Sequence, residues 1–413
     1  MIYLDNSSTT PVDPEVLEAM LPYLKEEFGN PSSRHYTLAV NAEKAVENAR
    51  EQVANLINAK HDEIIFTGGA SESNNFIIKG VADYMKYYEE KGNHIITSTV
   101  EHKSILQTCK FLNGEVYDNR VRNNSISRFV KLKNTVKKID RGYDVSFLKV
   151  NEYGQVLEND FINAINDNTI LASFIWGNNE IGSLNNIQKL SEIAKEKNIL
   201  FHSDGTQVLG KINIDVETTP VDFLSFSAHK IYGPKGVGAA YIRKNGLTQR
   251  NLTSLIHGGQ QEYGYRAGTH GVHNIVGFGK ACEIAKRDMD ANIKHILELE
   301  AEAKKMLTAK YPGIEFLGDP VNKIPGVIGM LIPNIVNEMF IKELADKVAI
   351  SAGSACGISE PSYVIDEINR KDRSSQFIRI TLSKSSIFNS RLLINLCKWF
   401  YILKNITGNF DFQ

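Results

Sequence analysis

Short runs of apolar, β-branched residues alternate along the chain with longer stretches whose apolar positions recur three and four residues apart. The first run, residues 63–67, predicts a buried strand, and after it Phe76, Ile77 and Val81 lie on one stripe of a helix. This alternation predicts an α/β domain with a mainly parallel sheet. The expected strands are 63–67, 94–99, 169–176, 199–202, 222–226 and 238–242, with further helices near 104–111 and 187–197.

The pattern changes after about residue 265. A long, charged helix is expected at 276–311, followed by a strand-like stretch at 326–332 and a helix near 338–347. A loop of small residues, Ser351–Gly357, then precedes a strand at 377–381. We interpret this part as a smaller α+β domain.

Composition excludes several classes of protein. The chain has 413 residues, of which 42% are apolar, and its net charge is −1, so it is neither disordered nor a globally basic nucleic-acid binder. Its four cysteines are scattered and form no Cys-x-x-Cys pair, which argues against a disulfide scaffold and a structural zinc site. The best apolar run, 324–336, is too short to cross a membrane and contains two prolines. With no signal sequence at Met1, the expected location is a reducing cytoplasm.

One segment differs from the rest in charge. Residues 120–141 hold eight basic residues and one acidic residue, a net charge of +7, and interrupt the regular alternation. We interpret the region of about 119–142 as an insertion. It is either a solvated loop or a docking surface for an acidic partner or a nucleic-acid complex.

Candidate chemistry lies directly after the expected strands, because ligands of parallel sheets bind beyond the carboxyl ends of the strands. The strongest candidate is Lys230, within the turn and Gly-rich stretch Ser225–Gly238. A lysine partly removed from water there has a lowered pKa, and its neutral amine can form a Schiff base. The alternative is a solvated lysine on a surface loop.

A carboxylate, Asp204, follows another strand. It could hold a protonated ring nitrogen, or it could simply cap a turn. The overlapping stretch Gly205–Lys211 matches most of a phosphate-binding P-loop, but Ile212 stands where that motif needs a hydroxyl for magnesium. Nucleotide hydrolysis is therefore disfavoured.

Three further sites complete the set. In Thr67–Asn75, a strand, two glycines and a hydroxyl at a helix start suit a phosphate, although Ser71 could be an ordinary N-cap. His102 could stack on a planar cofactor and move protons, or it could be structural. Cys356 lies among small residues that let a thiol reach a distant electrophile, whereas a buried, inert thiol is the alternative. The inert interpretation is the one we give to Cys109, Cys282 and Cys397.

Together these features resemble the pyridoxal-phosphate cysteine desulfurases of the NifS/IscS type, in the class V aminotransferase family. The likeness covers nearly the whole chain. The segments that carry it, besides those above, are Tyr3–Pro11, Phe28–Ser33, Gly177–Gly182, His257–Gly259, Arg266–Thr269, Ser354–Cys356 and Ile378–Arg379.

The resemblance implies a role for each matching residue. Lys230 would bind pyridoxal 5′-phosphate covalently, Asp204 would hold its ring nitrogen, His102 would stack on the ring and shuttle protons, and Cys356 would be the nucleophile. The other implied contacts are Gln207 to a ring oxygen, Ala70, Ser71, Ser227 and His229 to the phosphate, Asn179 and Arg379 to the substrate carboxylate, and Thr269 to the phosphate in a neighbouring subunit.

The resemblance also implies fold, activity and partners. The fold would be PLP fold type I, with a large domain at 15–262 and a small domain formed by 1–14 and 263–413. The enzyme would be a homodimer that converts L-cysteine to L-alanine and leaves the sulfur as a persulfide on Cys356. An acceptor protein in iron–sulfur cluster assembly, tRNA thiolation or DNA phosphorothioation would take that sulfur. A selenocysteine lyase, another class V lyase and a catalytically silent scaffold are the alternatives.

The chain departs from the family pattern at three places. Tyr263 stands where members often have arginine, in the stretch Glu262–Thr269. The loop with Cys356 is somewhat shorter than in housekeeping members, so sulfur delivery could reach less far. The residues after Arg379 lack the usual glycine and acidic helix start.

Overall fold

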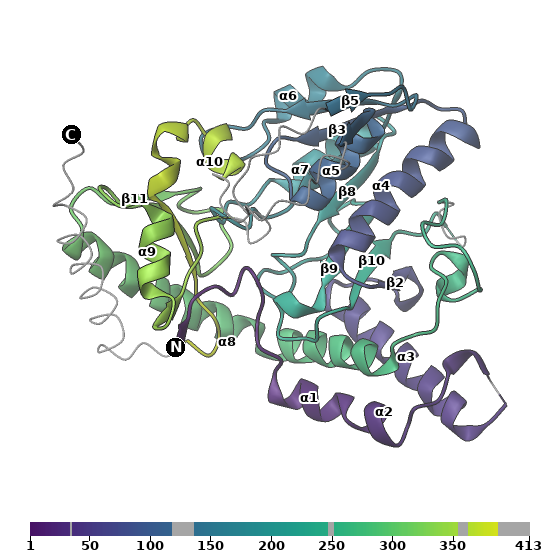
Figure 1. The fold of residues 1–413 in the computed structure, drawn as a ribbon. Helices are drawn as coiled ribbons and strands as arrows, with labels where there is room; N and C mark the ends of the chain where they lie inside the picture. Colours follow the sequence, from purple (N-terminus) through teal and green to yellow (C-terminus); the bar gives the residue numbers. More distant parts are fainter. Residues whose placement is uncertain (34, 118–135, 247–251, 354–361, 387–413) are drawn as a thin grey trace, which may run out of the picture.

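The computed structural model describes residues 1–33, 35–117, 136–246, 252–353 and 362–386. Its centre is a seven-stranded sheet with the order β2-β10-β9-β8-β7-β3-β6, in which only β10 runs antiparallel to its neighbours (Figure 1). The predicted α/β fold with a mainly parallel sheet is therefore confirmed. The strands are β2 (Ile64–Thr67), β3 (His94–Ser98), β6 (Asp144–Leu148), β7 (Thr169–Ile175), β8 (Leu200–Asp204), β9 (Phe223–Ser227) and β10 (Gly238–Ile242).

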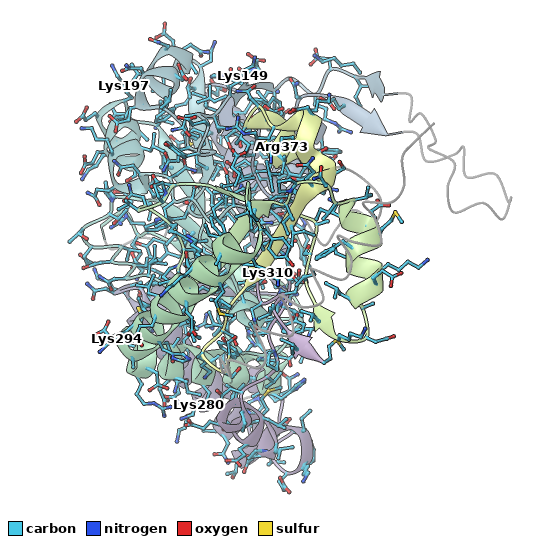
Figure 2. The ribbon with its side chains drawn as sticks, turned by 90° about the vertical axis from the view of Figure 1, so that its left-hand side faces the viewer. Lys149, Lys197, Lys280, Lys294, Lys310 and Arg373 are labelled. Carbon is cyan, nitrogen blue, oxygen red and sulfur yellow. The ribbon has the colours of Figure 1, made fainter. Side chains whose placement is uncertain are left out.

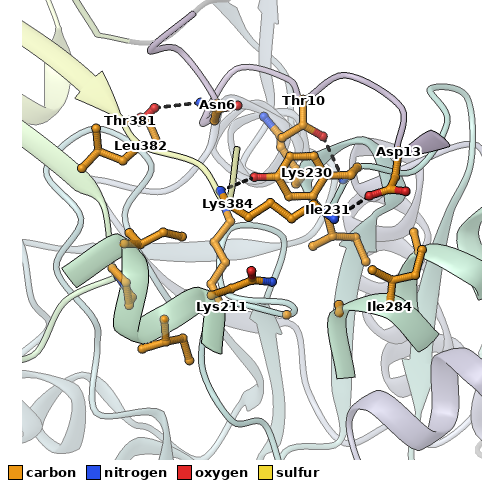
Figure 3. Close-up of a pocket in the computed structure, with 18 of the residues that line it drawn as sticks. Asn6, Thr10, Asp13, Lys211, Lys230, Ile231, Ile284, Thr381, Leu382 and Lys384 are labelled. Atoms are coloured by element: carbon orange, nitrogen blue, oxygen red, sulfur yellow. Dashed lines mark hydrogen bonds and ion pairs between the residues drawn. The ribbon is translucent and has the colours of Figure 1, made fainter. Parts of the chain in front are cut away.

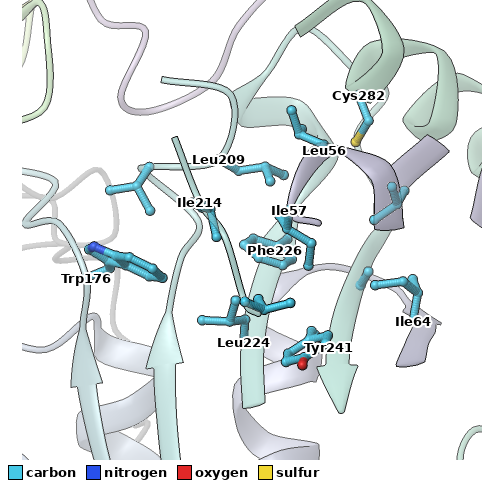
Figure 4. Close-up of a cluster of buried hydrophobic side chains, with 14 of the residues drawn as sticks. Leu56, Ile57, Ile64, Trp176, Leu209, Ile214, Leu224, Phe226, Tyr241 and Cys282 are labelled. Carbon is cyan, nitrogen blue, oxygen red and sulfur yellow. The ribbon is translucent and has the colours of Figure 1, made fainter. Parts of the chain in front are cut away.

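Helices cover both faces of this sheet. Because side chains alternate along a strand, Ile64 and Phe66 of β2 join the hydrophobic cluster on one face and Ile65 joins the cluster on the other. Figure 4 shows the first cluster, in which Phe226 lies beside Ile57. The first face packs against α3 (Thr37–Leu56), α7 (Ile187–Glu196) and the start of α8 (Val272–Lys310), the second against α4 (Ala70–Tyr87) and α5 (Lys103–Leu112).

A smaller part of the molecule is built on two further sheets. One is three-stranded, with the order β11-β12-β14, and the other pairs β1 with β13. The stretch near the N-terminus thus joins residues far along the chain. These strands are β11 (Glu315–Leu317), β12 (Val327–Leu331), β14 (Phe377–Thr381), β1 (Ile2–Tyr3) and β13 (Val348–Ala349); the nearby helices are α9 (Asn337–Leu344) and α10 (Tyr363–Glu367).

The long helix α8 connects the two parts. Its first half packs in the core of the large sheet through Phe278, and its second half packs against the small sheet through Leu299 and Leu307. Lys294 and Lys310 project from its exposed side (Figure 2). Within the described ranges, no helix, α8 included, has both the length and the apolar character needed to span a bilayer.

The basic segment lies mostly outside the described residues, which exclude 118–135. At its borders, β4 (Glu115–Tyr117) and β5 (Val136–Lys138) pair as a small antiparallel ladder separate from the main sheet. The Arg141 guanidinium lies 3.7 Å from the centre of the Phe111 ring. Several other elements were not predicted, among them β6, α3, α1 (Pro14–Met20), α2 (Pro22–Lys25) and α6 (Glu158–Ala164).

Candidate active site

A cavity of about 240 Å³ opens at the carboxyl ends of β7, β8 and β9. This is the edge at which the sequence predicts ligand binding, and residues of the N-terminal segment and of β14 also line it. The residues that line it are Ser7, Ser8, Ala70, Ser71, His102, Ile175, Asn179, Asp204, Thr206, Gln207, Ser227, His229, Lys230 and Arg379.

Lys230 stands on a short 3₁₀ turn, Ala228–Lys230, that begins as β9 ends. Its amine donates hydrogen bonds to the backbone carbonyls of Ser7 and Ser8, the latter at 2.8 Å. Both carbonyls belong to the N-terminal segment, which therefore crosses the mouth of the sheet beside this lysine. The alternative of a solvated lysine on a surface loop is wrong, because the side chain is partly buried and lines the cavity.

Asp204 is the last residue of β8 and is only 4% exposed. One carboxylate oxygen accepts the backbone N–H of Thr206 at 3.0 Å, so the residue does cap a turn. The other accepts the side-chain N–H of Asn74 at 2.9 Å. Turns, and no helix, follow at 205–212, which excludes a P-loop there.

His102 is the N-cap of α5. Its ring nitrogen Nδ1 lies 2.8 Å from the hydroxyl of Ser104 and accepts the backbone N–H of Ser104 at 3.2 Å. The same hydroxyl accepts a hydrogen bond from Asn74 at 2.8 Å. The structural and the functional interpretation of His102 are therefore compatible, since a helix cap also lines the cavity.

The start of α4 forms one wall of the cavity. Its N-cap is Gly69, with φ of 143°, so the prediction that Ser71 could be an ordinary N-cap is wrong. The backbone N–H of Ala70 donates to the Ser227 hydroxyl at 2.9 Å, which joins the helix start to the end of β9. The positive end of the helix dipole thus faces the cavity, as a phosphate site requires.

His229 lies on the same wall, and its Nδ1 is 3.1 Å from the hydroxyl of Thr9. Burial first, and then the positive charge of Lys230, lowers the pKa of His229 to about 4. The ring is therefore neutral at neutral pH. It can act toward an anion as a hydrogen-bond donor and not as a charge.

Arg379 lies on β14, in the smaller part of the molecule, and is 1% exposed. Its guanidinium donates to the carbonyl of Asn179 at 2.8 Å and to the Asp5 carboxylate at 2.5 Å. Its Nε has no hydrogen-bond partner among the described residues. A buried arginine with one unsatisfied N–H at a cavity wall can bind a carboxylate.

A second, smaller cavity, of about 50 Å³, also has Lys230 in its lining (Figure 3). Lys211 lines it and donates to the Gln207 side-chain oxygen at 3.3 Å, while the Gln207 amide donates to the carbonyl of Ser7 at 2.9 Å. Burial, and then the charges of Lys230 and Arg379, lowers the pKa of Lys211 to about 7. In the sequence, Lys211 stood out only as the last residue of the incomplete P-loop. Its contact with Gln207 was therefore not predicted.

The cavity therefore brings together all the candidate residues that the structure describes, except one. Thr269 is exposed and does not line the cavity of its own chain. Cys356 lies outside the described residues. In the part of the chain that the structure describes, no group of three or more His, Cys, Asp or Glu side chains could hold a metal ion.

Comparison with known proteins agrees with this arrangement. The family model described as "Aminotransferase class-V" matches residues 2–135 and 127–387. A cysteine desulfurase IscS of Dictyoglomus turgidum is 43% identical over 371 residues, which cover 89% of this chain and 86% of that protein. A mitosomal cysteine desulfurase of Encephalitozoon cuniculi is 41% identical, over 90% of this chain and 79% of the relative.

Solved structures of related proteins have the same fold as this chain. A NifS-like protein superposes with a TM-score of 0.84 at 31% identity, and the match covers 98% of this chain and 99% of that one. SspA in complex with cysteine superposes with a TM-score of 0.76 at 32% identity, over 94% of this chain and 100% of the other.

The chain belongs to the class V aminotransferase family. Within that family it is a cysteine desulfurase of the NifS/IscS type.

Proposed function

We propose that the cavity holds pyridoxal 5′-phosphate on Lys230 and that the chain uses it to move sulfur from L-cysteine to Cys356. The observation that carries this proposal is the meeting of an amine, a carboxylate and an imidazole, those of Lys230, Asp204 and His102, around one cavity at the mouth of the sheet. Members of this family are pyridoxal-phosphate enzymes in general.

The residues present fit that cofactor. The amine of Lys230 can bind its aldehyde, and the buried carboxylate of Asp204 can hold a protonated ring nitrogen. The helix start at Ala70, with the hydroxyls of Ser71 and Ser227, suits a phosphate. When bound, the cofactor supplies an electron sink for the charge that develops at the substrate Cα.

The substrate carboxylate would bind Arg379, helped by Asn179. Asp5, Ser8 and the Asn179 carbonyl already hold the guanidinium in place, so it needs little reorganisation. A fixed arginine with an unsatisfied Nε grips a carboxylate in a defined orientation. That orientation presents the Cα proton to Lys230, whose amine can accept it, while His102 lines the same cavity.

Cys356 would take the sulfur. Its thiolate bonds to the substrate sulfur, the Cβ–S bond breaks with its electron pair left on Cβ, and protonation of Cβ completes L-alanine. The described residues on either side of 354–361 both approach Glu180, the neighbour of Asn179. The Ser362 hydroxyl donates to its carboxylate, and a Cβ on Gly353 would lie 3.0 Å from it.

The two described cysteines are poor candidates for this role. Cys109 and Cys282 are fully buried, and burial raises the pKa of both thiols. Only the thiolate is the nucleophile, so neither can compete at neutral pH. Cys356 remains the choice that the resemblance implies.

The first test is to trap the cofactor on the protein with borohydride. Wild-type enzyme should carry a reduced covalent label on the peptide with Lys230, and Lys230→Ala should carry none. Lys211→Met is the matched control, because Lys211 is also a partly buried lysine and lines the neighbouring cavity, and it should keep the label. A label that survives in Lys230→Ala would refute the assignment.

We further propose a homodimer in which Thr269 completes the partner's phosphate site. Its exposure, and its absence from the cavity of its own chain, fit that role. A Thr269→Ala variant should bind cofactor more weakly, and it should do so only at protein concentrations where sedimentation detects the dimer.

We also propose that the sulfur of the Cys356 persulfide passes to an acceptor protein.

A further inference from the structure

A chain of hydrogen bonds links two residues of the site through two that have had no role so far. The Asn74 side chain gives one N–H to Asp204 at 2.9 Å and another to the Ser104 hydroxyl at 2.8 Å. That hydroxyl lies 2.8 Å from Nδ1 of His102. Asn74 is fully buried, on the second turn of α4, and Ser104 lies in the first turn of α5.

The direction of each bond follows from the donors available. A carboxylate accepts only, so the Asn74 amide must turn its NH₂ group toward Asp204. The second N–H of that group then goes to the Ser104 oxygen. Ser104 must donate its own hydrogen elsewhere, and Nδ1 of His102 is the acceptor within reach. The backbone N–H of Ser104 also points to Nδ1, so this nitrogen carries no hydrogen.

This orientation leaves the Asn74 amide oxygen unsatisfied. The oxygen is buried and has no hydrogen-bond partner among the described residues. An unsatisfied buried carbonyl is unfavourable, and a flipped amide would let the oxygen accept the Ser104 hydroxyl. The flip is prevented because it would also turn an oxygen toward the Asp204 carboxylate. The orientation is therefore set by the charge on Asp204.

We propose that Asn74 and Ser104 are positioning residues that hold His102 in the tautomer with its proton on Nε2, in response to the ionised carboxylate of Asp204. His102 lines the cavity, and Nδ1 is occupied, so Nε2–H is the group that it offers there. This inference rests on the proposed function, because it assigns His102 and Asp204 to the reacting site.

The arrangement has a chemical consequence. An imidazole with a fixed Nε2–H is a hydrogen-bond donor toward the cavity, and it can accept a second proton only if Ser104 reverses its hydroxyl. Reversal in turn leaves the Ser104 hydrogen without its present acceptor. Asp204 and His102 are thus coupled through Asn74 and Ser104, without direct contact between them.

The direct test is the ¹⁵N spectrum of histidine-labelled wild-type holoenzyme, with His102 assigned by its disappearance in His102→Gln. Our proposal requires a protonated Nε2 and an unprotonated Nδ1 at neutral pH. A signal from a protonated Nδ1 would overturn it. The measurement is made on the wild-type protein, and its assignment needs a His102→Gln variant that folds but need not be active.

A kinetic test separates positioning from a structural role. Ser104→Ala should lower kcat for L-cysteine by about tenfold, which is the worth of roughly one hydrogen bond, with KM nearly unchanged. Ser104→Thr keeps the hydroxyl and should restore most of the rate. The double variant Asn74→Ala/Ser104→Ala should be no slower than Asn74→Ala alone, because both residues act through the same series of hydrogen bonds.

Asn75→Ala is the matched control. Asn75 is the next residue on α4, but its side chain donates to the carbonyl of Ser71 and takes no part in the chain. It should keep the wild-type kcat. Additive losses in the double variant, or a rise in KM alone, would contradict the proposal while wild-type alanine production still upheld the function.

Discussion

The buried ion pair between Arg50 and Glu262 gives the most quantitative prediction for stability. The guanidinium binds both carboxylate oxygens, at 2.7 and 2.9 Å, and His270 binds the same carboxylate at 2.6 Å. The arginine and the glutamate are 2% and 4% exposed. The pair joins α3 to the residues just before the Arg266–Thr269 segment.

The size of the effect follows from the pKa of Glu262. Burial alone would raise it, but the hydrogen bonds from Arg50 and His270 outweigh burial and lower it from 4.5 to about 2. Each pKa unit is worth 1.36 kcal/mol, so the ionised form gains about 3 kcal/mol. This stabilisation is fully present above about pH 4.5 and is lost as the pH falls through about 2.

Glu262→Gln should therefore lower the free energy of unfolding by about 3 kcal/mol at pH 7, because it leaves a buried arginine without its main counter-charge. The assay is urea unfolding followed by fluorescence. The matched control is Glu47→Gln, which removes the other carboxylate near Arg50, 3.2 Å away but 45% exposed. That variant should lose less than about 1 kcal/mol. Equal losses in the two variants would refute the reasoning.

Two further predictions concern the site, and a third concerns the basic segment. Gly238→Ala should lower the cofactor content, measured as visible absorbance. The added Cβ would lie 2.2 Å from the Phe226 carbonyl and 2.7 Å from Gly69, which caps the start of α4. Normal absorbance would contradict this prediction. Arg379→Lys should raise KM for L-cysteine by about tenfold, because lysine lacks the rigid fork that grips a carboxylate; an unchanged KM would move the carboxylate elsewhere. Replacing residues 120–141 by a short Gly/Ser link should preserve cysteine turnover with a small-molecule reductant and lower sulfur transfer to the physiological acceptor, most at moderate salt; unchanged transfer would mean a plain surface insertion.

The mouth of the large sheet was predictable from sequence because of simple geometry. Asp204 ends a strand, His102 and Lys230 follow the ends of two others, and the carboxyl ends of parallel strands lie at one edge. Their meeting in one cavity needed no knowledge of side-chain packing.

Other features depend on contacts between distant segments. Arg379 reaches the cavity only because β14 pairs beside the N-terminal segment, where Asp5 receives its guanidinium. Strand patterns do not reveal such pairings, so here the family resemblance was needed. The link from Asn74 through Ser104 depends on side-chain rotamers, and neither residue was singled out from the sequence.

The helix α3 was missed for another reason. Its buried face is formed largely by alanines at positions 39, 42, 45 and 49. Small side chains allow α8 to pack closely against α3: a Cβ on Gly279 of α8 would lie 2.7 Å from the Cβ of Ala49. The same small side chains give only a weak helical pattern in a sequence examined for large apolar residues.

The central claim is that sulfur from L-cysteine comes to rest on Cys356. The most direct measurement is to mix the holoenzyme with L-cysteine, quantify alanine, and locate the added sulfur by peptide mass spectrometry after alkylation. The account predicts one alanine for each persulfide formed in the absence of reductant, with the persulfide on the Cys356 peptide. Cys356→Ser should keep the cofactor spectrum and form neither product. Sulfur found on Cys109 or Cys282, or alanine formed at the full rate by Cys356→Ser, would contradict it.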